Sequence, residues 1–267
     1  MKPPYIRSGR DSEKARGQAR VLAWPTGKKR SQSYNLVVCA ADKIKDSWIF
    51  SDFMGLCMSL MEQNVKGDFL SCFPVRSYFA VESYDTIKFG TFGASRTEYV
   101  HKYSREQFER GQIWWRDVKA SEVLGKIQRW INHNQNLSQS GDVVNIFFGG
   151  HGDQKLGFAC GNGFLHQAVL GQMLAHYRPG VQVNFVPNFC FSGLFVEALR
   201  SNDIANCHAV ASCSPMELSW SQSRSASGRY RSVRFAKAFL QSLSHIPKPP
   251  DSVPSWTIHE HESFLLQ

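Results

Sequence analysis

Short apolar runs alternate along this chain with longer segments in which apolar residues recur every three or four positions. The apolar runs predict buried strands at residues 34–41, 69–75, 143–149, 181–187 and 208–213. The longer segments have helical spacing and predict helices at residues 48–63, 114–136, 164–177, 192–200 and 233–243. Strands that alternate with helices in this way predict an α/β fold with a mostly parallel central sheet and helices on both faces.

Two segments interrupt the alternation. Residues 76–112 are rich in Gly, Ser and Tyr and lack a strong period, so we expect an irregular insertion that overhangs the site. Residues 157–161 predict a turn or a short edge strand. We assign residues 1–33 to a basic flexible extension, 34–246 to the folded domain and 247–267 to a Pro-rich tail.

Most of the positive charge lies in the extension. The chain has a formal net charge of +9, of which residues 1–33 carry +7, which leaves about +2 for all that follows. The extension is typical of a solvated tail, and we expect it to be dispensable for catalysis. Because the folded domain has no basic stripe, a nucleic-acid partner is not expected.

The cysteine pattern indicates free thiols in a reducing compartment. The seven cysteines form no CxxC pair and no zinc-site spacing with histidine. The first 20 residues lack the apolar core of a signal peptide, and no run approaches the length of a membrane span. We therefore expect a soluble cytoplasmic protein with no membrane partner, no cofactor and no metal, and we interpret the polar His259–Glu262 cluster near the end as solvated.

Two of the predicted strands end on residues that can carry nucleophilic chemistry. The run at 143–149 leads into Gly150-His151-Gly152, and the run at 181–187 leads into Asn188-Phe189-Cys190-Phe191-Ser192-Gly193. Carboxyl ends of parallel strands meet at one edge of a sheet, where open α/β folds place their active sites. A cysteine becomes a strong nucleophile when a nearby imidazole takes its proton. The pattern therefore predicts a catalytic dyad of Cys190 and His151.

Neighbouring groups complete this predicted site. The backbone amides of Gly152 and Cys190 are candidates for the oxyanion hole, and the helix that starts near Ser192 is expected to lower the pKa of Cys190. Asp153 is a candidate to orient His151. The aromatic pair Trp114-Trp115 is interpreted as packing. We interpret five other cysteines as core residues: Cys39, Cys57, Cys72, Cys160 and Cys213.

At these two motifs the chain resembles the caspase-like superfamily, which includes caspases, metacaspases and legumains. That family has one apolar block ending in His-Gly and a later one ending in Cys, often followed by x-Ser-Gly. The 39-residue spacing between His151 and Cys190 is similar to that of caspases and legumains, and residues 211–220 resemble the strand and pocket loop of legumains. The resemblance covers residues 34–243.

The resemblance implies a caspase-like three-layer sandwich and a cysteine peptidase that acts on peptides or proteins through an acyl-enzyme. Two alternatives stay open, namely a legumain-like peptide ligase or cyclase, and a catalytically silent interaction protein with the same fold. The stretch between Cys190 and Cys213 is too short for a caspase-type activation linker, so we expect a single uncleaved chain.

The family places a pocket residue two positions before the cysteine, where this chain has Asn188 in place of the family's Gln, Asp or Glu. Further pocket candidates are Lys43, Ser214, Glu217, Ser219 and Trp220. A pocket for Arg or Lys needs a buried carboxylate, and the position of the metacaspase acid falls near Pro215. The loops expected to flank the pocket carry five cations, namely Lys43, Lys45, Arg224, Arg229 and Arg231. Because such cations can bind a carboxylate, we expect a preference for an acidic or neutral polar residue before the scissile bond.

Overall fold

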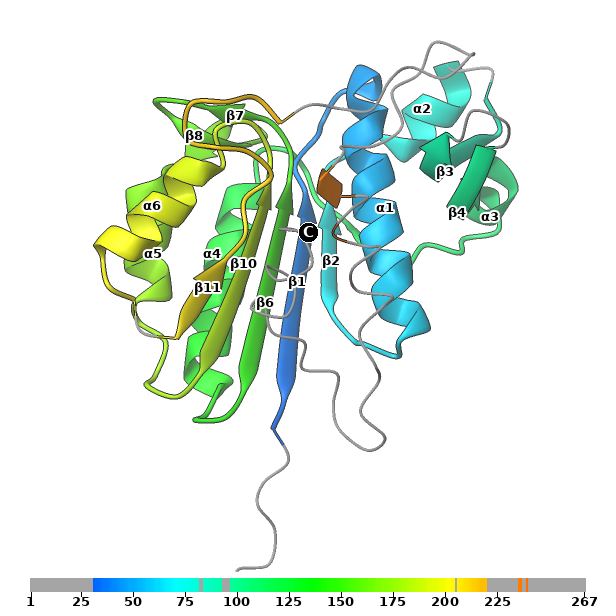
Figure 1. Cartoon of the computed structure of the whole chain (residues 1–267). Coiled ribbons are helices and arrows are strands. Elements are labelled where there is room, and N and C mark those ends of the chain that lie inside the picture. Colours follow the sequence, from blue (N-terminus) through cyan, green and yellow to red (C-terminus); the bar gives the residue numbers. More distant parts are fainter. Residues whose placement is uncertain are drawn as a thin grey trace, which may run out of the picture. The chain divides into compact units, whose positions relative to one another are not determined.

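Six parallel strands form the central sheet of this α/β protein. The computed structural model describes residues 31–81, 84–92, 97–204, 206–219 and residues 235, 236 and 239. The sheet has the order β11-β10-β6-β1-β2-β5, and every pairing in it is parallel (Figure 1). Its strands are β1 (Ser33–Cys39), β2 (Asp68–Ser71), β5 (Arg116–Asp117), β6 (Val143–Gly149), β10 (Gln182–Asn188) and β11 (Cys207–Ala209).

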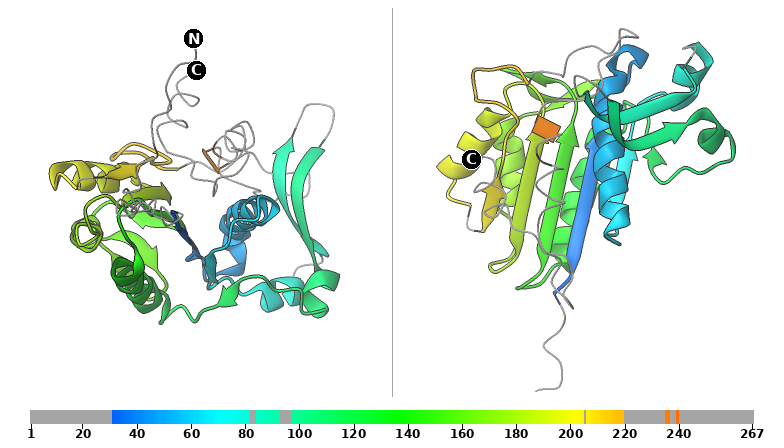
Figure 2. Two further views of the ribbon diagram at one scale, coloured as in Figure 1. Left: turned by 90° about the horizontal axis from the view of Figure 1, so that it is seen from below. Right: turned by 45° about the vertical axis from the view of Figure 1, so that its right-hand side comes forward.

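Helices cover both faces of this sheet, because its central strands are apolar on both sides. From β1, Val37 and Cys39 pack in the cluster that contains α1 (Ser47–Glu62). Leu36 and Val38 point the other way, into a cluster shared by three helices. These are α4 (Val123–Leu137), α5 (Gln167–Leu174) and α6 (Gly193–Ser201). In Figure 2 the sheet separates α1 from those three helices, which is consistent with a three-layer α/β sandwich.

A chain of asparagine amides crosses the sheet on the α1 face. Asn35, Asn145 and Asn184 occupy paired positions on β1, β6 and β10. Asn184 Nδ2 donates to Asn145 Oδ1 and Asn145 Nδ2 donates to Asn35 Oδ1, each at 2.8 Å. Asn35 Nδ2 donates to the carbonyl of Lys66 at 2.7 Å. All three side chains are buried, so we expect these hydrogen bonds to fix the register of the three strands.

Most of the described residues between 76 and 112 lie in helices or strands, so the expectation of an irregular insertion is wrong. They contain α2 (Val75–Val81), the antiparallel pair β3 (Thr86–Phe92) and β4 (Thr97–Ser104), and α3 (Arg105–Glu109). Ile87 and Phe89 alternate along β3 and are buried among the residues of the α1 cluster. Gly55 on α1 lets Phe89 approach, since a Cβ there would lie 2.5 Å from Cγ of that ring. The alternation of apolar and polar residues in β3 and β4 extends over too few positions to stand out from the polar residues around it.

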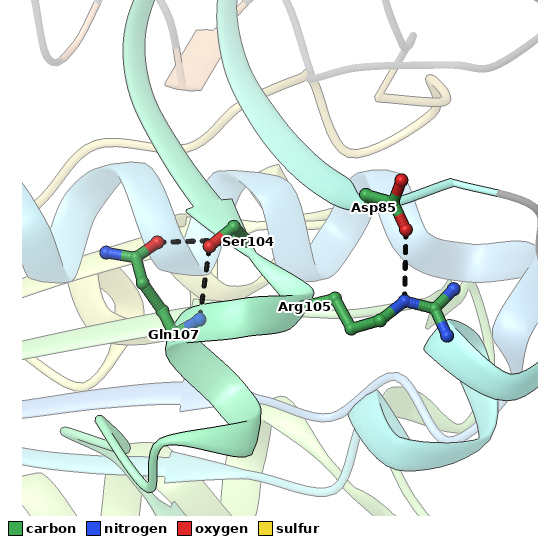
Figure 3. A network of polar contacts seen from close by, with 4 residues as sticks. All are labelled: Asp85, Ser104, Arg105 and Gln107. Atoms are coloured by element: carbon green, nitrogen blue, oxygen red, sulfur yellow. Dashed lines mark hydrogen bonds and ion pairs between the residues drawn. The ribbon is translucent and has the colours of Figure 1, made fainter.

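The junction between this hairpin and α3 is closed by a capping box (Figure 3). Ser104 Oγ accepts a hydrogen bond from the backbone N–H of Gln107, and the backbone N–H of Ser104 donates to Gln107 Oε1. Arg105 Nε donates to Asp85 Oδ1 at 3.1 Å, which ties the start of the helix to the residue before β3. These contacts satisfy backbone donors that a helix start leaves unpaired.

Two of the predicted helices are shorter than expected. The segment at 114–136 starts its helix only at Val123, because Trp114 and Trp115 meet edge-to-face and pack in the aromatic core on the α1 face. The helix predicted at 164–177 is α5, and Gly163–Leu165 forms β9 instead. The packing role of the tryptophan pair is confirmed, since Trp115 is buried.

The first strand begins close to the predicted start of the folded domain, whereas the predicted end at residue 246 lies outside the described residues. β1 begins at Ser33, and Gln32 already pairs with the sheet, because its N–H donates to Asp142 Oδ1 at 2.9 Å. Residues 1–30 and 240–267 lie outside the described residues, and so do the expectations about the basic extension and the Pro-rich tail. Within the described parts, no helix combines the length and apolar character needed to cross a membrane.

A small antiparallel sheet stands at the carboxyl ends of the central strands. It contains β7 (Gly152–Asp153), β8 (Gly157–Cys160) and β9 (Gly163–Leu165), so the edge strand expected at 157–161 is present. Figure 1 shows β7 and β8 at the end to which the arrows of β6 and β10 point. This end of the molecule therefore collects the segments that follow β1, β6, β10 and β11.

Candidate active site

Strand register brings the histidine and the cysteine to the same level of the sheet edge. Gly149 of β6 pairs with Asn188 of β10, and His151 and Cys190 each follow two residues later. The backbones touch at this point, since a Cβ on Gly152 would lie 1.9 Å from the carbonyl oxygen of Cys190. The structure thus brings together the segments that carry His151, Gly152 and Cys190. Only glycine at position 152 permits this approach.

Cys190 lies in a sharp turn between β10 and α6. The next residue, Phe191, has a φ of +60°, and its N–H donates to the carbonyl oxygen of Glu217 at 2.9 Å. Burial raises the pKa of the half-buried Cys190 thiol, and the backbone N–H of Ser219 partly opposes this shift. The sequence predicted a lowered pKa from the start of α6, but desolvation outweighs that effect here. The resting side chain is therefore a thiol that needs a base.

His151 is held from one side by a carboxylate. Its Nε2 lies 3.1 Å from Asp46 Oδ2, and the Trp48 ring meets the imidazole edge-on at 6.1 Å between centroids. The histidine side chain is 51% exposed and that of Asp46 is 8% exposed. In this orientation Nε2 faces the carboxylate, which leaves Nδ1 as the nitrogen available for proton transfer. The buried acid fixes the tautomer and the orientation of the ring.

Asp46 was missed in the sequence. It ends the short 3₁₀ helix η1 (Ile44–Asp46) and occupies the N-cap position of α1, yet its side chain makes no capping hydrogen bond. A polar loop after the first strand was visible, and the carboxyl end of that strand lies beside β6. The sequence did not show in which direction this loop turns after β1, and so did not show that Asp46 lies beside His151. Asp153, the residue proposed from adjacency, instead accepts hydrogen bonds from the amides of Lys155 and Leu156 in its own turn, which lowers its pKa.

A pocket next to the candidate dyad contains a buried carboxylate. It lies between α1, the sheet and the residues Phe235, Ala236 and Phe239, and it encloses about 370 Å³ of empty space, part of which is open to solvent. Its walls are apolar apart from Asp52 and Asn188. Asn188 Nδ2 donates to Asp52 Oδ2 at 3.2 Å, and the buried Asn188 Oδ1 has no hydrogen-bond partner.

Of the cations that motivated the expected acidic preference, the two that the structure describes do not line this pocket. Lys43 and Lys45 are exposed, while Arg224, Arg229 and Arg231 lie outside the described residues. The carboxylate that the sequence did not locate is Asp52, which comes from the second turn of α1 and is buried. Asp46 and Asp52 are six residues apart, which is not a separation that places two residues on one face of a helix. The sequence therefore gave no sign that both acids lie at the sheet edge.

The segment after β11 lies against the turn that contains Cys190. Ser214 and Glu217 are exposed, and the Glu217 carboxylate accepts from the Ser214 N–H at 3.4 Å, within its own turn. Ser219 is buried, and its hydroxyl has no hydrogen-bond partner. Trp220 lies outside the described residues. Of the cysteines expected in the core, Cys39, Cys57 and Cys160 are buried, whereas Cys72 and Cys213 are only half-buried.

The described residues contain no group of three or more His, Cys, Asp or Glu side chains suited to hold a metal ion. The chemistry that this arrangement supports is nucleophilic attack by a thiol assisted by an imidazole and a carboxylate. A scan of the chain against models of protein families and a search of curated proteins find no match.

Proposed function

We propose that this protein is a cysteine peptidase of the caspase-like kind, with Cys190 as nucleophile and His151 as the acid–base residue. The observation that supports it most is the matched register of β6 and β10, which brings both residues to the same sheet edge, together with Asp46 behind the histidine. Structural cysteines and histidines do not require such an arrangement. A base oriented by a third group is the signature of an activated nucleophile.

In the first half of the reaction, Cys190 transfers its proton to His151 Nδ1 and its sulfur attacks the carbonyl carbon of the scissile peptide bond. The negative charge that develops on the carbonyl oxygen is stabilised by the backbone N–H groups of Gly152 and Cys190. Asp46 faces the positive charge that forms on the imidazole. Its near-complete burial makes that interaction stronger than it would be in water.

In the second half, the C–N bond breaks and His151 returns the proton to the leaving amine. The acyl group stays on the Cys190 sulfur as a thioester. Water then attacks this thioester with His151 as base, which releases the carboxylic acid and restores the thiol. The exposed side of His151 is where the amine departs and the water enters.

The pocket beside Asn188 receives the side chain that precedes the scissile bond. Its apolar walls suit a long aliphatic stem. The buried Asp52 carboxylate, which accepts from Asn188 Nδ2 and has a further partner, gives the polar end a negative charge that favours a cation over an anion. We therefore propose Lys or Arg as the preferred residue, in place of the acidic or neutral residue expected from the sequence.

Labelling with an acyl-type irreversible probe tests the activity. A peptidyl acyloxymethyl ketone should modify Cys190 selectively over the six other thiols, and Cys190→Ala should abolish labelling at that position. His151→Ala should slow labelling roughly 100-fold or more, since a general base contributes at least about that factor. Equal labelling of several cysteines, or an unchanged rate in His151→Ala, would identify a silent protein with this fold.

Matched probes test the pocket. Probes ending in Lys, Asn and Asp should label the wild-type chain in that order of rate, and Asp52→Asn should reduce the difference between Lys and Asp at least about tenfold. Glu197→Gln, at an exposed position of α6 that does not line the pocket, is the control that should leave the order unchanged. Faster reaction with the Asp probe would contradict the pocket assignment while leaving the dyad intact.

A further inference from the structure

A second cysteine lies directly beside the candidate nucleophile. Cys213 follows β11, and its Sγ donates to the carbonyl oxygen of Phe189 at 3.3 Å. The same sulfur lies 3.4 Å from Ser192 Oγ, which also accepts from the backbone N–H of Cys213 at 3.3 Å. Cys213 thus contacts the residue before Cys190 and the residue two positions after it.

The backbones of the two segments are also in contact. A Cβ on Gly193 would lie 2.5 Å from Pro215 Cδ and 2.7 Å from the carbonyl carbon of Ser214. Disulfides need their Cα atoms within roughly 7 Å, which only segments packed this closely provide. Both thiols are half-buried, so each is partly open to small solutes, whereas Cys39, Cys57 and Cys160 are enclosed in the core.

Cys207, which lies in β11, offers a comparison. It is half-buried like Cys213, but it pairs with Val183, seven residues before Cys190 on β10. At about 3.3 Å per residue this separation is roughly 23 Å, far beyond the reach of a disulfide. The proposal therefore depends on the position of Cys213, since the other half-buried cysteine near this edge of the sheet, Cys207, is out of reach of Cys190.

We propose that Cys190 and Cys213 form a peroxide-sensitive disulfide pair that reversibly switches off the site. A peroxide transfers one oxygen atom to the Cys190 sulfur, which gives a sulfenic acid and, from hydrogen peroxide, one water. The Cys213 sulfur then attacks the Cys190 sulfur, the S–O bond breaks, and the hydroxyl leaves as water with the Cys213 proton. Two thiols are oxidised and one peroxide is reduced.

This reaction protects the nucleophile as well as blocking it. A sulfenic acid with no partner is oxidised further to sulfinic and sulfonic acids, which thiol reductants do not reverse. The disulfide with Cys213 diverts Cys190 from that route, and a dithiol reductant restores both thiols. The inference rests on the same reactive Cys190 as the proposed function, but it is measured by mass and not by turnover.

The test uses the full chain treated with a small excess of hydrogen peroxide, then alkylated and digested. Arg200 lies between the two cysteines, so trypsin separates them into two peptides that a disulfide would join. The wild-type chain and Cys207→Ser should both give this linked pair, with a loss of two hydrogen atoms in the intact mass. Dithiothreitol should then restore nearly all free Cys190.

In Cys213→Ser the linked pair should be absent and Cys190 should gain oxygen atoms instead. Recovery of free Cys190 by dithiothreitol should fall at least about tenfold relative to wild type. Wild-type Cys190 that accumulates as sulfinic acid, or that pairs with another cysteine, would overturn the proposal even if the variant fails to fold. A linked pair in a chain whose Cys190 does not react with the acyl probe would support the redox pair and reject the peptidase.

Discussion

Asp46 stands where a helix cap is expected, but its carboxylate serves His151 instead of the amides of α1. Capping side chains contribute about 1 kcal/mol to helix stability. The chain gives up that contribution at a position beside the candidate base, which supports a role for Asp46 in orienting the imidazole.

Removal of this carboxylate should lower activity without unfolding the protein. We expect Asp46→Ala to reduce the rate of Cys190 labelling by about 10- to 100-fold, because His151 loses its orientation but is still present. Asp46→Asn should weaken substrate binding less than it lowers the rate of turnover. Asp153→Asn is the control, since that side chain only closes its own turn. If Asp153→Asn lowers the labelling rate as much as Asp46→Asn does, Asp46 is not the positioning residue.

Gly152 is the glycine of the candidate site that a larger residue could not replace without moving the backbone. A methyl group there would overlap the carbonyl oxygen of Cys190. Gly152→Ala must therefore push the two motifs apart, and a misplacement of about 1 Å at reacting groups costs on the order of 100-fold in rate. Gly163→Ala is a matched control, since its added Cβ would meet only Leu124 Cδ2 at 3.6 Å. Circular dichroism should show both variants folded, and normal labelling of Gly152→Ala would contradict the site geometry.

The predictable part of the site consists of residues that follow apolar runs directly. His151 and Cys190 were found in this way, because the end of a parallel strand fixes the position of the next residue or two. Asp46 and Asp52 could not be found in the same way. Each depends on how a loop or a helix turns after β1, and no local pattern in the sequence records that direction.

At the scale of the elements, the asparagine chain across β1, β6 and β10 fixes how the strands align. Asn145→Ala would leave the amide of Asn184 and the carbonyl of Asn35 without these partners inside the sheet. Each unsatisfied buried group costs about 1–3 kcal/mol, so we expect roughly 3 kcal/mol less stability to unfolding by denaturant. Asn136→Ala, at an exposed position of α4, should cost far less. Similar losses of stability in the two variants would show that the hydrogen-bonded asparagines do not stabilise the sheet.

The fold was more predictable than its details. Buried parallel strands such as β6 and β10 can be recognised in the sequence by their continuous apolar runs. The hairpin of β3 and β4 did not, because it buries only alternate residues of short strands against α1. The start of α4 was misplaced for a related reason, since the aromatic residues before it are apolar but pack on the opposite face of the sheet.

At the scale of the whole molecule, the fully and partly buried thiols should make the protein less stable as the pH becomes alkaline. Burial raises the pKa of Cys72 and Cys207 to about 12, and raises those of Cys39, Cys57 and Cys160 as well. In the unfolded chain these thiols lose their protons near pH 9, while the folded chain keeps them. The unfolded state then binds fewer protons, so stability is complete below about pH 9 and is lost as the pH rises toward the folded values.

Each such thiol lowers the free energy of unfolding by up to about 1.4 kcal/mol per pH unit in that window. Melting temperatures under reducing conditions should therefore be level from pH 7 to about 8.5 and fall steeply by pH 10. Cys57→Ala should make the fall shallower even if it lowers the melting temperature at neutral pH. A melting temperature independent of pH up to 10 would show that these thiols ionise in the folded state.

The order of strands across the sheet has a consequence for how protons move. Going from β1 to β6, β10 and β11, the carboxyl edge presents a carboxylate, an imidazole, a thiol and a second thiol, in the same sequence as along the chain. Neighbouring strands are about 4.8 Å apart, so groups on adjacent strands lie closer than groups two strands apart. In the proposed peptidase reaction, the effect of Asp46 on Cys190 passes through His151. In the proposed oxidation, Cys213 acts on Cys190 without the histidine, so the two reactions would reach the same sulfur from the two strands that flank β10.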